Sequence, residues 1–130
     1  MNDFIARWTP RLLSVLRIIT AFLFTLHGTQ KWLAFPVPRP NPTVLWSQGG
    51  IAGVFELVGG FLLLLGLFTR PVAFVLSGLM AFAYFLAHAP VDFWPIVNGG
   101  ELAALYCFVF LDLAAAGGGP WSLNRWLRHK

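Results

Sequence analysis

Four long apolar stretches, separated by short segments rich in proline, glycine and charged residues, set the pattern of the chain. The clearest stretch runs from Ile51 to Phe68, where every residue except Glu56 is apolar or glycine. As a helix, a stretch of this length extends roughly 27 Å, which is enough to cross the hydrocarbon core of a bilayer with little tilt. The pattern predicts four transmembrane helices, at residues 12–34, 51–68, 71–89 and 99–116.

The composition indicates a membrane protein rather than a soluble one. Hydrophobic residues make up 58% of the 130-residue chain and charged residues 11%, whereas soluble domains contain about 45–50% and about 25%. So few charges cannot cover the surface of a soluble globule. We therefore predict a single domain, residues 1–130, with an all-α fold, namely an integral membrane four-helix transmembrane bundle.

The distribution of basic residues predicts how the bundle is oriented. The net charge of +4 does not indicate a nucleic-acid partner, because the basic residues gather near the chain ends and in one loop, where they suit the headgroups of membrane lipid. With four spans, the side of both termini carries more lysine and arginine than the other side, so the positive-inside rule predicts that both termini are cytoplasmic (N-in/C-in). The first side holds Arg7, Arg11, Arg70, Arg125, Arg128 and Lys130, and the other holds Lys31 and Arg39.

Within this topology, five polar helix residues fall in the outer half of the bilayer, and because polar groups are costly in lipid we expect them to face the bundle interior. One interpretation is a small site in which Glu56 and Glu101 accept or relay protons. His27, Lys31 and His88 would then contact a bound quinone. A histidine beside a carboxylate suits both tasks, since each group can change its charge near neutral pH. The alternative is a polar plug that only fixes the register of the helices.

Two charged residues, Arg17 and Asp112, fall in the inner half of the bilayer. We predict that they form an ion pair joining the first and fourth helices, with a structural role. The alternative is that each side chain extends separately to the cytoplasmic headgroups.

The sequence argues against haem, metal and an internal electron carrier. His27 and His88 alone are a poor indication of haem, because no C-x-x-C-H motif is present. Neither histidine follows a glutamate by three positions, as in di-iron carboxylate bundles, so we expect no metal. Cys107 is the single cysteine and permits no disulfide within the chain, and no flavin-binding motif is visible. Any electron carrier would therefore be a bound quinone, a bound haem or a partner protein.

In the residues that carry these features, the chain resembles the DoxX family of small four-helix bacterial membrane proteins, over roughly residues 11–124. One position departs from the family pattern: the closing motif usually reads Ser-Leu-Asp, whereas Asn124 stands here, which puts the contacts of this tail in doubt. The resemblance rests on Arg17, HGTQK (His27–Lys31), FELVGGFLLLLGLFTR (Phe55–Arg70), His88, NGGE (Asn98–Glu101) and GGGPWSLNR (Gly117–Arg125).

The resemblance implies a protein of the bacterial inner membrane that is linked to redox metabolism. Some relatives are associated with thiosulfate:quinone oxidoreduction and others with oxidative or thiol stress. We therefore expect a membrane subunit of quinone-linked redox metabolism that works with a redox partner protein, as an oxidoreductase subunit if it is catalytic. Assembly into a homo-oligomer stays open. The alternatives are a non-catalytic module that binds or transports a small amphiphile, and a membrane scaffold.

Overall fold

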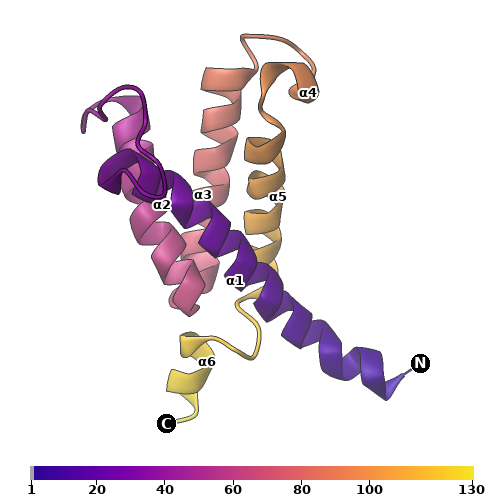
Figure 1. Ribbon diagram of the computed structural model, residues 1–130. Coiled ribbons are helices and arrows are strands. Elements are labelled where there is room, and N and C mark those ends of the chain that lie inside the picture. Colours follow the sequence, from indigo (N-terminus) through magenta and orange to yellow (C-terminus); the bar gives the residue numbers. More distant parts are fainter. Residues whose placement is uncertain (1) are drawn as a thin grey trace.

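The computed structural model describes residues 2–130, and its regular elements are helices (Figure 1). Each of the four predicted apolar stretches forms a helix. The structure also contains short helices in the second loop and in the tail, which the sequence did not predict. The elements are α1 (Asp3–Leu33), α2 (Gln48–Leu65), α3 (Thr69–Ala83) with its π-helical continuation η1 (Tyr84–His88), α4 (Pro95–Asn98), α5 (Glu101–Ala116) and α6 (Leu123–Arg128).

Three of the helices are long and apolar enough to cross a membrane: α1, α2 and the continuous helix Thr69–His88. The chain is therefore a multi-pass membrane protein. Helix α5 has 16 residues and spans about 24 Å, which is slightly shorter than a typical transmembrane helix. A membrane crossing by α5, and with it the four-span topology, stays a prediction.

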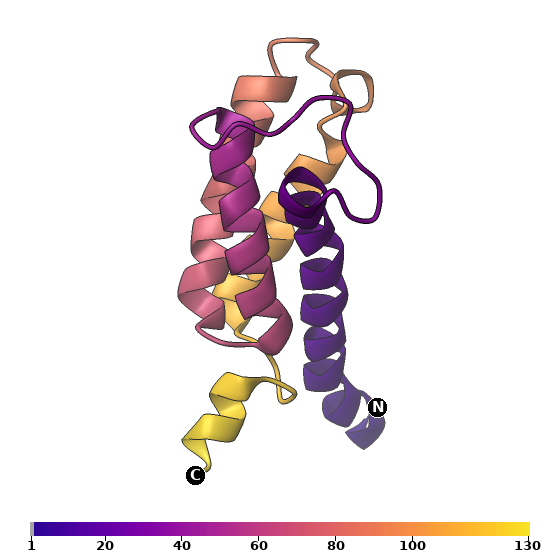
Figure 2. The same cartoon turned by 60° about the vertical axis from the view of Figure 1, so that its left-hand side comes forward.

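The four long helices pack as two pairs. Helix α1 lies along α2, α3 lies along α5, and the pairs join where α2 meets α3, while α1 and α5 touch over only a short stretch (Figures 1 and 2). Both chain termini lie at one end of the bundle, which we call the terminal end. The two long connections, residues 34–47 and 89–100, lie at the other end, which we call the loop end.

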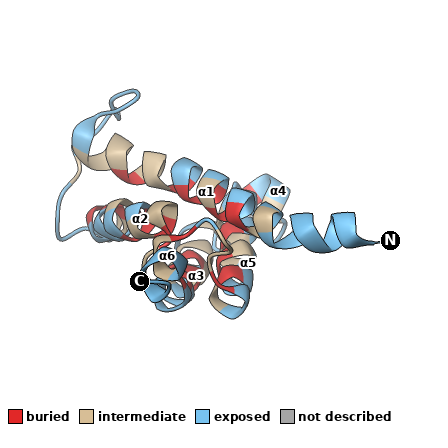
Figure 3. Cartoon of the chain, turned by 90° about the horizontal axis from the view of Figure 1, so that it is seen from below, coloured by how far each residue is buried: buried red, intermediate tan, exposed pale blue. Residues whose placement is uncertain are grey.

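Helix α1 begins earlier than the sequence predicts. The predicted first helix starts at residue 12, but α1 starts at Asp3 and passes through Pro10. An acidic residue in the first turn suits the helix dipole, and Pro10 removes one backbone hydrogen bond without ending the helix. The extra turns project from the bundle and are exposed on nearly all sides (Figure 3).

Burial in the bundle follows the pattern of a membrane protein. Only a narrow interior strip of each of the four long helices is buried (Figure 3), whereas most large apolar side chains point outward, as expected for contact with lipid. At the centre, the ring of Phe24 packs edge-on against Phe110, with 4.8 Å between centroids. Glycines bring α1 and α2 close together: a Cβ atom on Gly28 would lie 2.7 Å from the backbone nitrogen of Leu57.

The structure corrects the predicted ion pair between Arg17 and Asp112. Asp112 is exposed, and the only ion pair among the described residues lies elsewhere, between Lys31 and Glu56. Arg17 is 1% exposed, and its guanidinium donates to the backbone oxygens of Gly118 and Trp121 in the tail. The tail returns beneath the bundle and supplies acceptors next to Arg17, whereas Asp112 lies on the outer face of α5.

The tail is also fixed to the turn between α2 and α3. The side-chain oxygen of Asn124 accepts from the backbone nitrogen of Thr69 at 3.2 Å and also from its hydroxyl, and the Asn124 backbone nitrogen donates to Gly66. These contacts need an oxygen but not a negative charge. Asn124 therefore makes a tail contact in place of the usual aspartate, which answers the doubt raised by this position.

Candidate functional site

A cavity of about 680 Å³ lies between the helix pairs toward the loop end. All four long helices contribute to its wall, together with the loop before α2. Most of the wall is apolar. Its polar or ionisable side chains are His27, Lys31, Arg39, Gln48, Glu56, His88 and Tyr106.

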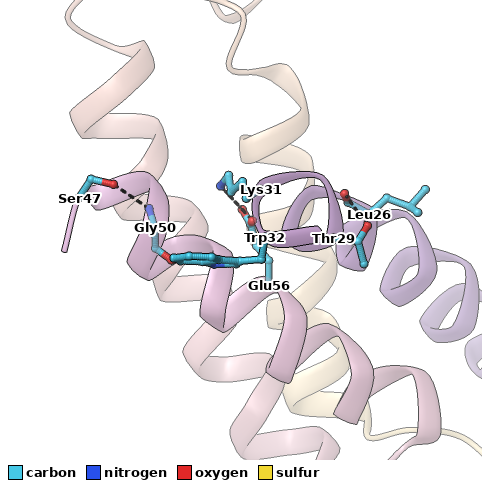
Figure 4. Close-up of polar contacts among 7 residues, drawn as sticks. All are labelled: Leu26, Thr29, Lys31, Trp32, Ser47, Gly50 and Glu56. Atoms are coloured by element: carbon cyan, nitrogen blue, oxygen red, sulfur yellow. Dashed lines mark hydrogen bonds and ion pairs between the residues drawn. The ribbon is translucent and has the colours of Figure 1, made fainter. Parts of the chain in front are cut away.

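The centre of the site is an ion pair between Lys31, in the last turn of α1, and Glu56, near the middle of α2 (Figure 4). The Lys31 Nζ atom lies 2.9 Å from each of the two carboxylate oxygens, and it donates a hydrogen bond to Oε1. The Glu56 side chain is 7% exposed and the Lys31 side chain 18%. A buried carboxylate in a transmembrane helix thus has its counter-charge at the edge of the cavity.

The second carboxylate oxygen of Glu56 is only partly satisfied. Oε2 is in charge contact with Nζ, but among the described residues no group donates a well-directed hydrogen bond to it. A buried polar atom without a hydrogen-bond partner is rare in native proteins and costs free energy. Glu56 also lines the cavity, so the ion pair lies beside a space that a ligand can occupy.

Contacts between the end of α1 and the start of α2 bring Lys31 to Glu56. The indole nitrogen of Trp32 donates to the backbone oxygen of Gly50 at 3.3 Å, and the hydroxyl of Ser47 caps α2 by accepting from the nitrogen of Gly50 at 3.0 Å (Figure 4). A Cβ atom on Gly53 would lie 2.7 Å from the Trp32 indole nitrogen. Glycine at this position therefore allows the close approach that places the lysine beside the carboxylate.

His88 is held by a second group of hydrogen bonds at the end of η1. Its Nδ1 atom lies 3.1 Å from the backbone oxygen of Asn98. A carbonyl only accepts, so Nδ1 carries the proton and Nε2 of the neutral ring is an acceptor. The Asn98 side chain donates to the Tyr84 hydroxyl and the Asp92 carbonyl, and accepts from the nitrogen of Gly100. This network fixes the loop that orients His88.

Tyr106 is a cavity residue that the sequence interpretation missed. Its ring packs between His27, at 6.2 Å and perpendicular, and Phe110, at 5.6 Å and nearly parallel. No hydrogen bond of its hydroxyl to another described residue is present. The available signal was composition: the chain has 13 phenylalanines but only two tyrosines, and a hydroxyl in an otherwise apolar helix needs a partner.

Comparisons of the sequence with known proteins identify the family of this chain. Residues 12–89 match the sequence profile of DoxX. The chain belongs to the DoxX family. It is 46% identical over 129 residues to an uncharacterized protein of Haemophilus influenzae, covering 95% of this chain and 96% of that protein. A second uncharacterized protein of Haemophilus influenzae is 29% identical over 124 residues, covering 86% of this chain and 80% of its own length. No solved structure matches the chain at a significant level.

The DoxX match contains four of the five residues predicted for the outer polar cluster, and the structure brings those four to one cavity. For the fifth, Glu101, the prediction that it faces the bundle interior is wrong. It is the first residue of α5 and is exposed, outside the cavity wall, while Ala103 and Tyr106 of the same helix line the cavity. Successive residues of a helix point about 100° apart, so the start of α5 turns Glu101 away from the bundle. The cavity residues are thus His27, Lys31, Glu56 and His88, joined by Tyr106.

The cavity of this chain offers carboxylate, imidazole, ammonium and phenol groups for hydrogen bonding and proton transfer. Among residues 2–130, no three His, Cys, Asp or Glu side chains cluster closely enough to hold a metal ion. The prediction that the protein binds neither metal nor haem stays a prediction. The arrangement suits a neutral ligand with a compact polar head and an apolar body.

Proposed function

We propose that this DoxX-family protein binds a quinone in the cavity and supports quinone-linked redox metabolism as the subunit of a membrane complex. The observation that carries the proposal is the buried Glu56 carboxylate, which among the described residues is paired only with Lys31 and lines an apolar-walled cavity. A buried charge in a membrane helix is expensive and commonly marks a ligand or proton pathway.

The size and lining of the cavity support a quinone. A volume of about 680 Å³ lies within the usual range for small-molecule sites, about 300–1,000 Å³. Phe24, Met80 and Leu86 provide apolar surface for a ring and the first part of its tail. A few polar groups at one side would orient the oxygens of the headgroup, which is the usual division of roles in such sites.

In this proposal Glu56 accepts or relays a proton, and Lys31 balances its charge. His27 and His88 contact the headgroup, and Tyr106 supplies a hydroxyl at the position for which we had expected Glu101. Oxidation of a quinol releases two electrons and two protons. With one cysteine in the chain, the electrons pass to or from a redox partner protein, and the chain described here binds the quinone and handles protons.

We further propose that the protein lies in a bacterial inner membrane with both termini cytoplasmic. Two features support this orientation: the termini share one end of the bundle (Figures 1 and 2), and that end carries most of the lysine and arginine. The cavity then lies in the outer half of the bilayer.

The quinone proposal is tested on protein purified in mild detergent. We expect mass spectrometry of organic extracts to find about one quinone, counted in both redox forms, per chain in the native protein. The variant Glu56→Gln should retain at least about tenfold less, because the amide lacks the negative charge to which Lys31 and a hydroxyl of the reduced ligand donate. Asp112→Asn is the matched control, since it removes an exposed carboxylate on α5 and should retain the quinone.

Thermal unfolding of each variant separates binding from folding. A folded Glu56→Gln variant that keeps its full quinone content contradicts the proposed site. Native protein that carries no quinone and binds none when it is added contradicts the proposed function. Retention of a different amphiphile in the same cavity would instead favour the non-catalytic binding module.

A further inference from the structure

We propose that the cavity selects the reduced, hydroxyl-bearing form of its ligand, a quinol, over the oxidised quinone. The inference rests on the proposed function and names the redox form that the same site prefers. It follows from the hydrogen-bonding polarity of two side chains in the cavity wall, Glu56 and His88.

The first of these groups is the Glu56 carboxylate. As the partner of the Lys31 ammonium it is ionised, and an ionised carboxylate accepts hydrogen bonds but cannot donate them. Its Oε2 atom is buried, and apart from the Lys31 ammonium 2.9 Å away it has no donor among residues 2–130. A quinol hydroxyl can donate to this oxygen. A quinone carbonyl cannot, and its own lone pairs would face a negative charge.

The second group is the imidazole of His88. Because Nδ1 donates its proton to the Asn98 carbonyl, the neutral ring presents only an acceptor, Nε2, to other partners. His88 also lines the cavity. A neutral His88 can therefore bind a hydroxyl but not a quinone carbonyl.

The donors in the wall do not offset this preference. The Lys31 ammonium donates to Glu56 and keeps a further N–H group, and His27, Arg39 and Gln48 also bring donors to the wall. These donors do not discriminate between the two forms, because the oxygen of a quinol hydroxyl accepts a hydrogen bond as a quinone carbonyl does. The Tyr106 hydroxyl has no partner among the described residues, and a hydroxyl can rotate to donate to a quinone or accept from a quinol equally well. The two forms thus differ mainly at the acceptors, and leaving a buried charged acceptor without a donor is the costly case.

The test compares three ligands of similar shape on the native protein in lipid nanodiscs at pH 7 without oxygen. They are a benzoquinone with a single isoprene unit, its dithionite-reduced quinol, and the dimethyl ether of that quinol. We expect the quinol to bind about tenfold more tightly than the quinone, as for a hydrogen bond to a charged group. The dimethyl ether, which has the ring but no donor, should bind no better than the quinone.

In Glu56→Gln the amide offers a donor as well as an acceptor, so we expect the ratio of quinol to quinone affinity to fall toward one. Because this variant leaves Lys31 unpaired, the double variant Lys31→Met/Glu56→Gln provides the same measurement without a buried charge. The comparison on the native protein stands even if neither variant folds.

The outcomes separate this inference from the function on which it rests. Equal binding of quinone and quinol, tighter binding of the quinone, or binding of the dimethyl ether as tight as that of the quinol overturns the redox preference and leaves the quinone site intact. Absence of binding by all three ligands overturns both proposals.

Discussion

The two ends of the bundle each bury one charged side chain, and they treat it in opposite ways. At the terminal end, Arg17 is 1% exposed, and backbone oxygens of the tail surround its guanidinium. At the loop end, Glu56 is 5% exposed and has a lysine on one side and a cavity on the other. The comparison shows that burial of a charge alone does not identify a site. Each side chain has one buried atom without a hydrogen-bond partner among the described residues, Arg17 Nε and Glu56 Oε2, and what distinguishes Glu56 is the open volume beside it.

The difference has a structural cause in the segments that close each end. The glycine-rich segment that leads into α6 fits tightly under the bundle, where a Cβ atom on Gly118 would lie 2.9 Å from the Thr69 hydroxyl and 3.1 Å from the Arg17 guanidinium. Gly119 also adopts a left-handed backbone conformation, φ +77°, which glycine adopts readily. At the loop end, Arg39 and Gly99 of the two connections line the cavity, which keeps a volume of about 680 Å³.

The largest effect is expected at the terminal end. Arg17→Met removes the donor to two backbone carbonyls of the tail, and because each unpaired buried carbonyl costs about 1–3 kcal/mol, we expect the free energy of unfolding to fall by about 3 kcal/mol. Unfolding in detergent, followed by circular dichroism, measures the loss. Trypsin cleavage at Arg125 should accelerate as α6 detaches, whereas the quinone content of the folded fraction should stay unchanged.

A matched control sharpens this first prediction. Asp112→Asn should change the free energy of unfolding by less than about 0.5 kcal/mol, as is usual for surface substitutions. A large destabilisation in Asp112→Asn would contradict the structure and support the ion pair between Arg17 and Asp112 that the sequence predicted.

A smaller effect is expected at the loop end. Lys31→Met leaves Glu56 buried without its counter-charge, and since the lysine is partly exposed we expect a destabilisation of about 2 kcal/mol, below the about 3–5 kcal/mol of a fully buried pair. The double variant Lys31→Met/Glu56→Gln should recover most of this loss. A double-mutant cycle by thermal unfolding measures the coupling, and strictly additive single-variant effects would argue against the pair.

The smallest effect is expected at the junction between the tail and α3. Asn124→Leu removes the oxygen that accepts from the Thr69 nitrogen, so we expect a loss of about 1 kcal/mol, as for a helix cap. Asn124→Asp keeps the oxygen and should be as stable as the native protein or slightly more stable, because a negative charge at a helix start is favourable. Equal melting temperatures of the Leu and Asp variants would show that the contact contributes nothing.

The sequence alone located much of the candidate site. A lone carboxylate within an apolar helix is rare enough to single out Glu56, and antiparallel threading of the predicted helices placed His27, Lys31 and His88 at the same depth. The structure confirms that these four meet at one cavity. Their use in quinone binding and proton transfer stays a proposal.

Other features depended on directions that sequence spacing does not specify. Glu101 has the right depth but points away, because the rotation of α5 about its axis is set by packing against α3. Tyr106 was missed because an aromatic residue in an apolar helix is usually part of the core. The prediction that Arg17 pairs with Asp112 was wrong, because its partners are backbone carbonyls. Carbonyls occur at every residue, so no side-chain pattern reveals which of them will accept.

The sequence by itself determined that this chain is a helical membrane protein, where its four long helices lie along the chain, and which polar residues fall toward the same end of the bundle. These properties follow from the length and spacing of apolar runs, because each helix by itself must match the thickness of the bilayer and satisfy its own backbone hydrogen bonds. The tertiary structure alone decided which buried charge is closed and which remains open to a ligand. That outcome depends on how the helices rotate and where the tail and loops return, and both are set by contacts between segments far apart in the chain.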